Sequence, residues 1–279
     1  MSDVFVNSET RLYGLIGHLV ESSKSPAIHN KLFESENING TYLAFDVERR
    51  SLEEAVKGLR VLGARGFNVT IPFKESVIDY LDDIDASASD IGAVNTVLIE
   101  NGRLVGYNTD GRGFCAVLED EGVDLADSKI LLIGAGGAAR GIAFALSEHD
   151  FNCLDIINRN EKRGSNLAKD LNDIRVEYIG NEVKDKSKYD LVINTTSIGM
   201  TPNEEVSPMI VDGFKSTAVF ADIVYKPHET KFLKEAKCLG HKVVYGIDML
   251  IYQALLSEEI WQKNIFDKKS LKYSIRDVI

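Results

Sequence analysis

The stretch Lys129-Ile-Leu-Leu-Ile-Gly-Ala-Gly-Gly-Ala-Ala-Arg-Gly141 decides the fold of this chain. A continuous apolar strand, Ile130 to Ile133, runs directly into a glycine-rich turn, and a helix with apolar residues Ile142 and Leu146 is expected to follow. Glycines at such a turn permit a tight bend and let a pyrophosphate approach the backbone. The pattern therefore predicts a dinucleotide-binding Rossmann unit, with a glycine-rich turn that holds no ligand as the alternative.

The end of the next strand, about 20 residues after the glycine turn, indicates which dinucleotide is bound. An acidic residue at this point would bind the free ribose hydroxyls of NAD. The sequence instead has Asn158-Arg159-Asn160, followed by Lys162 and Arg163. Guanidinium and amide donors suit a 2′-phosphate, so we expect NADP as the cofactor. The alternative is that these residues are solvated side chains at the start of a helix.

The first hundred residues alternate short apolar strands with helices, which predicts a parallel α/β layer. Ser25 is expected to cap a first helix that has Pro26 at its first position, and Ser51 with Glu54 to form a capping box before a second. Strands are expected at residues 13–16, 43–47 and 67–71, the last of them ended by Pro72.

A second βαβ series begins at Lys129, with further strands expected at residues 154–157, 191–193, 219–222 and 243–245. No long linker separates the two series, so the boundary is expected near Gly111. The predicted fold class is α/β with two domains, an α/β substrate domain and a Rossmann-type doubly wound NADP-binding domain.

Composition narrows the classes of partner. The 279 residues carry a formal net charge of −11, which argues against nucleic-acid and anionic-membrane surfaces, because both need clustered Lys and Arg. Cys115, Cys153 and Cys238 are scattered and form no CxxC pair, so we expect neither a disulfide nor a metal site. With no export signal and no long apolar stretch, a cytoplasmic protein with a small-molecule substrate is expected, as a monomer or a homodimer.

A candidate proton-transfer pair comes from two polar segments. Asn68-Val-Thr-Ile-Pro-Phe-Lys74 places Asn68 and Thr70 on one face of the expected strand and Lys74 beyond its end, while Asp110 stands at the expected domain junction. Oxidation of an alcohol by hydride transfer needs a group that takes the hydroxyl proton, and the five histidines share no motif. A lysine with a lowered pKa can be that base when a carboxylate orients it. The alternatives are a solvated lysine and a turn-forming aspartate.

Together these segments resemble the shikimate dehydrogenase family, in order and over nearly the whole chain. The matching motifs are Ser23-Lys-Ser25-Pro26 with His29-Asn30, Asn68 to Lys74, Gly92-Ala-Val-Asn-Thr96, Asn108-Thr-Asp-Gly111, Gly134 to Ala139, Asn158-Arg159, Asn194-Thr-Thr-Ser-Ile-Gly199, and Gly246 with Met249 and Gln253. The resemblance implies a reversible, NADPH-dependent reduction of 3-dehydroshikimate to shikimate, within the biosynthesis of chorismate and aromatic amino acids, with Lys74 and Asp110 as the catalytic pair.

The resemblance also implies a role for each site residue. The substrate would be hydrogen-bonded by Ser23, Ser25, Asn68, Thr70, Asn95, Asp110 and Gln253, and faced by Tyr225. The pyrophosphate would lie against Gly134, Ala135, Gly136, Gly137, Ala138 and Ala139, and the adenosine phosphate against Asn158, Arg159 and Arg163. The nicotinamide end would be lined by Thr195, Ser197, Ile223, Gly246 and Met249.

The family pattern further implies a discontinuous substrate domain, residues 1–110 with 246–279, around an NADP-binding domain of residues 111–245. Four other interpretations remain open. One is a quinate or quinate/shikimate dehydrogenase that prefers NAD, and another is a slow paralogue of the family. The others are a binding protein that senses NADP without turnover, and a structural protein with an empty Rossmann-like fold.

Overall fold

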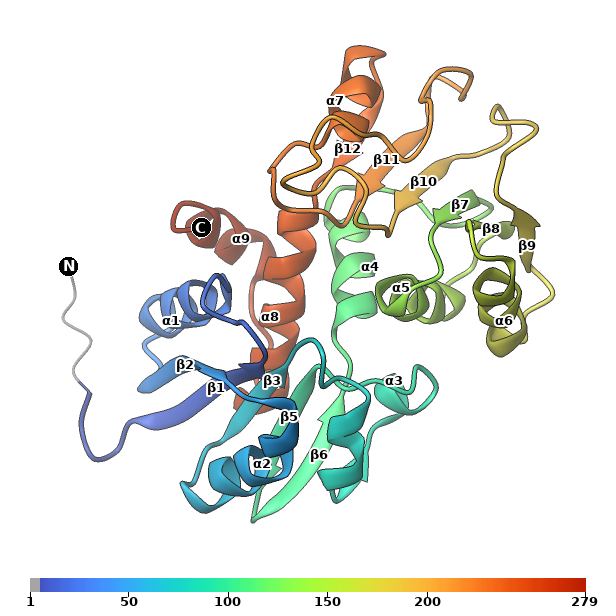
Figure 1. The fold of residues 1–279 in the computed structure, drawn as a ribbon. Coiled ribbons are helices and arrows are strands. Elements are labelled where there is room, and N and C mark those ends of the chain that lie inside the picture. The colour runs from blue at the N-terminus through green and yellow to red at the C-terminus, as the bar shows by residue number, and fades with distance from the viewer. Residues whose placement is uncertain (1–5) are drawn as a thin grey trace. The chain divides into compact units, whose positions relative to one another are not determined.

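The computed structural model describes residues 6–279, which form two compact units (Figure 1). Unit 1 comprises the chain up to Thr109 together with Ile251–Ile279, and unit 2 comprises Asp110–Leu250. Each unit contains one six-stranded sheet. No helix within residues 6–279 is both long enough and apolar enough to span a membrane.

The sheet of unit 1 has the strand order β2-β1-β3-β5-β6-β4 and is mixed rather than parallel. Its strands are β1 (Arg11–Gly17), β2 (Gly40–Asp46), β3 (Gly66–Val69), β4 (Asp83–Ile84), β5 (Thr96–Glu100) and β6 (Arg103–Tyr107). β1 runs parallel to β2 and β3, whereas β5 is antiparallel to both β3 and β6. Three of the five strand pairs, including β4 with β6, are parallel as predicted, and the prediction was wrong only for the two pairs that β5 forms.

A hairpin between β5 and β6 explains the difference. Glu100 pairs with Arg103 across a two-residue turn, Asn101-Gly102, in which both residues have positive φ, 50° and 75°. Asn-Gly is the preferred pair for such a turn, because both positions need the left-handed conformation. The sequence therefore carries a hairpin signal that the spacing of apolar residues alone does not show.

The helices of unit 1 begin differently from the predicted caps. They are α1 (Ser25–Ser35), α2 (Leu52–Val61), α3 (Ala86–Ser89), the greater part of α8 (Gly246–Gln262), α9 (Lys268–Arg276) and the 3₁₀ helices η1 (Arg49–Ser51) and η2 (Ser76–Tyr80). Ser25 is already the first residue of α1, and Ser51 precedes α2 without a side-chain cap bond. A capping residue needs an extended backbone, but Ser51 lies at φ −110° and ψ 15° at the end of η1. Both cap predictions were wrong.

Unit 2 has the strand order β12-β11-β10-β7-β8-β9, and every neighbouring pair is parallel. The strands are β7 (Lys129–Ile133), β8 (Cys153–Ile157), β9 (Val176–Gly180), β10 (Leu191–Asn194), β11 (Val219–Asp222) and β12 (Lys242–Val244), and the helices are α4 (Asp110–Asp120), α5 (Gly137–Ser147), α6 (Glu161–Leu171) and α7 (Lys231–Cys238). The predicted strands are confirmed, and β9 is additional. The order reverses between β7 and β10, the switch point at which doubly wound sheets bind ligands.

α8 packs into unit 1 against the centre of its sheet. The Trp261 indole Nε1 donates to the carbonyl of Val97 on β5 at 2.9 Å. A Cβ at Gly66 on β3 would lie 2.2 Å from the same indole nitrogen, so only glycine leaves room for the ring. The final helical segment is therefore part of the core of unit 1, although it is distant in sequence.

A buried polar pair lies beside this contact. His29 on α1 and Glu258 on α8 have fully buried side chains, and their Nδ1 and Oε1 atoms are 2.6 Å apart. The imidazole stacks on the ring of Tyr42 from β2, with centroids 4.1 Å apart and planes within 2°. Within residues 6–279 the other ring nitrogen, Nε2, has no hydrogen-bond partner. The pair thus ties α1, β2 and α8 together at one point.

Glu258→Ala should lower the free energy of unfolding by about 3 kcal/mol, because it leaves His29 buried without its partner. Urea unfolding of the full chain measures the change. The control is Glu53→Gln on α2, which disturbs only an exposed pair with Lys57 and should change stability little. Equal effects of the two substitutions would contradict a structural role for the buried pair.

Candidate active site

Polar side chains from separate segments of unit 1 converge around Asn95, which is 2% exposed. Its Oδ1 accepts from the Thr109 backbone N–H at 2.9 Å and from the Thr96 hydroxyl at 2.9 Å. Its Nδ2 donates to Thr109 Oγ1 at 3.0 Å and to Gln253 Oε1, on α8, at 3.5 Å. The structure therefore brings together two predicted substrate residues, Asn95 and Gln253. The name Asn95 cluster is used below for six residues: Asn68, Asn95, Thr96, Thr109, Gln253 and Ser257.

Asn68 on β3 belongs to this cluster and is held in one orientation. Its Oδ1 accepts from the Tyr42 hydroxyl at 2.7 Å, while its Nδ2 donates to Thr96 Oγ1 at 3.0 Å and to Ser257 Oγ at 3.1 Å. Asn68 is only 5% exposed, so these contacts leave its amide little freedom to turn. Ser257 was missed by the sequence analysis, although it lies one helical turn after Gln253.

The segment after β3 differs from the prediction. β3 ends at Val69, so Thr70 lies in a turn rather than on the strand face, and Ile71 is 73% exposed. The Thr70 backbone N–H donates to Ile16 O at 3.0 Å, and its carbonyl accepts from the Phe73 N–H at 3.0 Å. The Ile71 carbonyl also accepts from the His18 N–H at 3.1 Å, so the contacts with the β1 side continue up to Pro72, which offers no N–H.

Each member of the predicted catalytic pair is connected to this cluster through the backbone. The Lys74 carbonyl accepts from the N–H of Val94, which immediately precedes Asn95, at 2.7 Å. Asp110 begins α4 and directly follows Thr109. Ser23 and Ser25 are half-buried at the start of α1, where the Ser23 hydroxyl oxygen accepts from the Ser25 N–H at 3.2 Å. The side-chain pairing of Lys74 with Asp110 stays a prediction.

In unit 2 the glycine turn has the form that a diphosphate requires. Gly134 has φ of +116°, and a Cβ there would lie 2.6 Å from Thr195 Oγ1, so only glycine fits. Gly136 and Gly137 are exposed and face open space, and α5 begins at Gly137. Ala135 and Ala138 are half-buried and Ala139 is buried, as close packing of helix on sheet requires. Free N–H groups at the start of α5 suit an anion.

The end of β8 is polar and basic. Asn158 follows the strand and its Nδ2 donates to Asn160 O at 2.7 Å, while Asn160 caps α6 by accepting from the Arg163 N–H at 3.0 Å. Arg159 and Arg163 are exposed, and neither forms an ion pair within the described part of the chain. No carboxylate occupies positions 158–160. This end of the sheet therefore suits a phosphate better than a free ribose.

Three segments of unit 2 meet beside the glycine turn. The Thr195 hydroxyl donates to Ile133 O at 2.7 Å, and the Ile223 N–H donates to Asn194 O at 3.1 Å. A Cβ at Gly246 would lie 2.5 Å from the Ile223 carbonyl, so the start of α8 approaches this backbone closely. Ser197 and Tyr225 are exposed and Met249 is half-buried, so their predicted contacts with a ligand stay predictions.

A buried carboxylate that the sequence analysis missed ends β11. Asp222 is 1% exposed, and its three hydrogen-bond partners, Asn194, Val224 and Thr230, are all neutral. Burial raises the pKa of Asp222 to about 6, and the hydrogen bonds that it accepts only partly oppose this.

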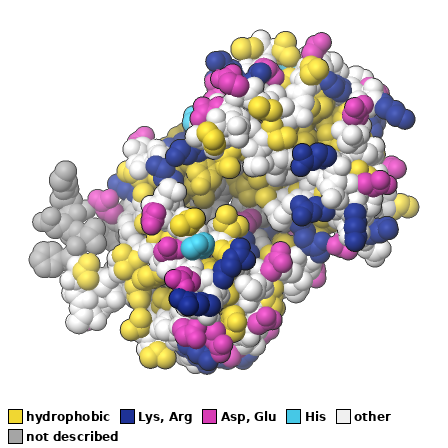
Figure 2. All heavy atoms as spheres, in the orientation of Figure 1, with side chains coloured by type: hydrophobic (Ala, Val, Ile, Leu, Met, Phe, Trp, Pro, Cys, Tyr) yellow, Lys and Arg dark blue, Asp and Glu magenta, His cyan; other side chains and the backbone are white. Residues whose placement is uncertain are grey.

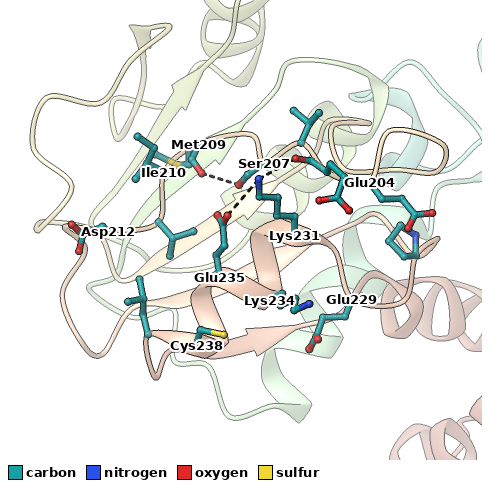
Figure 3. A pocket seen from close by; sticks show the side chains of 15 residues that line it. Glu204, Ser207, Met209, Ile210, Asp212, Glu229, Lys231, Lys234, Glu235 and Cys238 are labelled. Carbon is teal, nitrogen blue, oxygen red and sulfur yellow. Dashed lines mark hydrogen bonds and ion pairs between the residues drawn. The ribbon is translucent and has the colours of Figure 1, made fainter.

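A large cavity of about 1040 Å³ lies elsewhere in unit 2, between α7 and the segment 204–212 (Figure 3). The Lys231 ammonium, on its wall, donates to Glu205 O at 3.0 Å and lies 3.8 Å from the Glu235 carboxylate. None of the predicted site residues lines this cavity, so we do not assign it to the candidate active site. Among residues 6–279 no group of His, Cys, Asp or Glu could hold a metal ion.

The visible face of the molecule carries positive and negative side chains interspersed, without one broad basic field (Figure 2). The formal net charge of the whole sequence is −11, so acidic side chains outnumber basic ones.

The difference in free energy of unfolding between the wild type and Asp222→Asn should depend on pH. Because folding raises the pKa of Asp222, its stabilising contribution is present at low pH and is lost as pH rises through about 6. The free energy of unfolding of the wild type relative to the variant should therefore fall by roughly 1 kcal/mol from pH 5 to pH 8. Urea unfolding of both proteins at the two pH values measures this, and a difference that grows with pH would contradict the assignment.

Comparison with known proteins connects this geometry to a family. Residues 15–97 match the shikimate dehydrogenase substrate binding domain, and residues 117–228 match shikimate / quinate 5-dehydrogenase. The NADP(+) shikimate dehydrogenase of one Methanococcus maripaludis strain is 45% identical over 92% of this chain and 93% of its own.

Solved structures of relatives match nearly the whole chain. A crystal structure of a shikimate dehydrogenase in complex with NADP+ has a TM-score of 0.90 and 40% identity, and the match covers 99% of this chain and 98% of that one. The shikimate 5-dehydrogenase of Thermus thermophilus, in complex with NADP(H) and shikimate, has a TM-score of 0.87 and 34% identity, covering 97% and 100% of the two chains. The chain therefore belongs to the shikimate dehydrogenase family of oxidoreductases.

Proposed function

We propose that this protein is an NADP-dependent shikimate dehydrogenase, which interconverts shikimate and 3-dehydroshikimate in the biosynthesis of aromatic amino acids. The observation that carries the proposal is the Asn95 cluster of unit 1, to which the backbone of Lys74 is joined through Val94. Hydroxyl and amide side chains suit a polyol, because each ring hydroxyl both donates and accepts. A site of this kind rejects analogues that leave its polar groups unpaired.

The carboxylate of the substrate is assigned to the start of α1. Ser23 and Ser25 are half-buried there, and the first N–H groups of an 11-residue helix favour an anion. Thr70, Asn68 and Gln253 are proposed to contact the ring hydroxyls, and Tyr225 to face the substrate. The relative from T. thermophilus, which was solved with shikimate, supports the same class of ligand.

NADP is the proposed cofactor, and it supplies a nicotinamide that accepts or returns the hydride. Gly134 to Ala139 would hold its pyrophosphate at the open glycine turn, and Arg159 and Arg163 would pair with its 2′-phosphate. Thr195, Ile223 and Met249 belong to the proposed nicotinamide end. The lack of a carboxylate at positions 158–160 and the NADP+ complex of a relative 40% identical both support NADP over NAD.

Lys74 and Asp110 are proposed as the proton-transfer pair. Oxidation of the ring alcohol removes a hydride from carbon and a proton from the hydroxyl oxygen. Lys74, as the neutral amine, would accept that proton and return it in the reverse direction. The Asp110 carboxylate would orient the amine and balance the charge of the ammonium that forms.

The proposed substrate-binding domain comprises residues 1–110 with 246–279, and the proposed NADP-binding domain comprises residues 111–245. The compact units, which change at 109/110 and 250/251, support this assignment. α8 crosses the second boundary, so its first residues belong to one unit and Gln253 to the other.

Initial rates test the proposed function directly. Shikimate and quinate, each with NADP+ and with NAD+ at matched concentrations, should give rapid formation of reduced cofactor only with shikimate and NADP+. Quinate oxidation or a preference for NAD+ would instead favour a quinate/shikimate dehydrogenase. Cofactor binding without turnover of either substrate would contradict the proposal and indicate an NADP-binding sensor.

Lys74→Ala should reduce kcat about 100-fold or more with little change in KM for shikimate, because proton transfer is lost while ring contacts remain. Steady-state kinetics at saturating NADP+ measure both constants. Lys57→Ala, an exposed lysine on α2 in the same unit, is the control and should be close to wild type. A large rise in KM with kcat preserved would assign Lys74 to substrate binding instead.

A further inference from the structure

Asp222, the last residue of β11, joins three segments of unit 2 through one buried carboxylate. Its Oδ1 accepts from Asn194 Nδ2, at the end of β10, at 3.0 Å, and from the Val224 N–H at 3.0 Å. Its Oδ2 accepts from the Thr230 hydroxyl, before α7, at 2.7 Å. The side chains of Asn194 and Thr230 are both fully buried, so water does not compete for these contacts.

The hydrogen bond between Asp222 and Asn194 determines the conformation of segment 195–198. An ionised carboxylate can only accept, so Asp222 forces the Nδ2 group of Asn194 to face it and the Oδ1 atom to face away. That Oδ1 accepts from the Thr196 N–H at 3.1 Å and from the Thr196 hydroxyl at 2.7 Å. Asn194 Nδ2 also donates to Ile198 O at 3.3 Å. The orientation of one amide therefore fixes a segment that contains Thr195 and Ser197.

The hydrogen bonds from Thr230 and Val224 to Asp222 hold the segment that follows β11. Thr230 caps α7 by accepting from the Leu233 N–H at 3.4 Å, which leaves its hydroxyl proton for Asp222. The bond to Val224 turns the backbone directly after Ile223, against which Gly246 packs without room for a Cβ. The segments on both sides of the predicted nicotinamide end thus depend on the same two oxygen atoms.

Fold stability alone does not account for this choice of residue. A carboxylate buried among neutral donors is costly, and burial raises the pKa of this one to about 6. The other buried aspartate on this sheet, Asp155 on β8, instead has a cation, Lys188, at 2.5 Å and the Tyr189 hydroxyl at 2.6 Å. An apolar residue at 222 would avoid the cost but would orient neither Asn194 nor Thr230.

We infer that Asp222 is a positioning residue for hydride transfer, which holds segments 195–198 and 223–225 in the geometry that orients the nicotinamide ring. The inference rests on the proposed function. It places Asp222 outside contact with the cofactor, so that its effect is exerted through Asn194, Val224 and Thr230.

The test compares how Asp222→Asn affects binding of the whole cofactor and binding of its adenosine part alone. Dissociation constants are measured for NADPH and for 2′,5′-ADP, which carries the adenosine phosphates but no nicotinamide, and kcat is measured with shikimate and NADP+. We expect kcat to fall about tenfold or more and NADPH to bind more weakly. Binding of 2′,5′-ADP should stay within about twofold of wild type.

Asp155→Asn is the matched control, because it replaces a buried aspartate of the same sheet at the β8 side. It should leave kcat within about twofold of wild type. A folded Asp222→Asn with kcat also within about twofold overturns the inference, as does a parallel loss of NADPH and 2′,5′-ADP binding, which would mean general damage to the unit.

Two Thr230 variants carry the test if Asp222→Asn does not fold. Thr230→Val removes one donor and should lower kcat in the same direction, whereas Thr230→Ser keeps the hydroxyl and should restore it. Equal kcat for the two overturns the inference. If the wild type lacks turnover with shikimate, the proposed function fails, but the contrast between NADPH and 2′,5′-ADP still tests the role of Asp222.

Discussion

A polar side chain can be buried in a protein core only when its hydrogen-bonding groups find partners, and this constraint shapes both units of the chain. In unit 1 the amide of Asn68 has four partners, which come from β2, from β5 with the residue before it, and from α8. In unit 2 the carboxylate of Asp222 has three partners from β10, the turn after β11 and the start of α7. Because their hydrogen-bonding groups have partners on several elements, these two side chains admit few alternative arrangements.

The same constraint explains why α8 belongs to the site as well as to the core. The helix contributes Trp261 and Glu258 to packing in unit 1, and Gln253 and Ser257 to the Asn95 cluster. Its first residue, Gly246, belongs to unit 2, where it leaves room for the Ile223 backbone. One continuous helix therefore carries residues of both proposed binding sites.

Local signals were sufficient to predict much of the fold. The strand and glycine turn from Lys129 to Gly141 predicted unit 2 because the apolar run, the turn and the helix are adjacent in sequence. The Asn101-Gly102 hairpin was equally local and was overlooked. The predicted caps at Ser25 and Ser51 failed because a capping residue is defined by its backbone conformation, which residue type alone does not determine.

The hydrogen-bond partners of the buried polar residues could not be predicted from such local signals. Asn68 and Ser257 are 189 residues apart, and Asn194 and Asp222 are on neighbouring strands 28 residues apart. No periodicity links such positions, so Ser257, Tyr42 and Asp222 emerged only from the structure. The roles assigned to Lys74, Asp110 and the NADP-binding residues came from their motifs and from the resemblance of those motifs to one family.

A crystal structure of the protein with NADP+ and shikimate would test most directly whether the Asn95 cluster binds shikimate and the glycine turn binds NADP+. We expect the pyrophosphate against Gly134 to Ala139, the 2′-phosphate at Arg159, and a ring hydroxyl of shikimate within hydrogen-bonding distance of both Lys74 and Asp110. Shikimate bound away from Lys74, or a 2′-phosphate that makes no contact with Arg159 or Arg163, would contradict the proposed function.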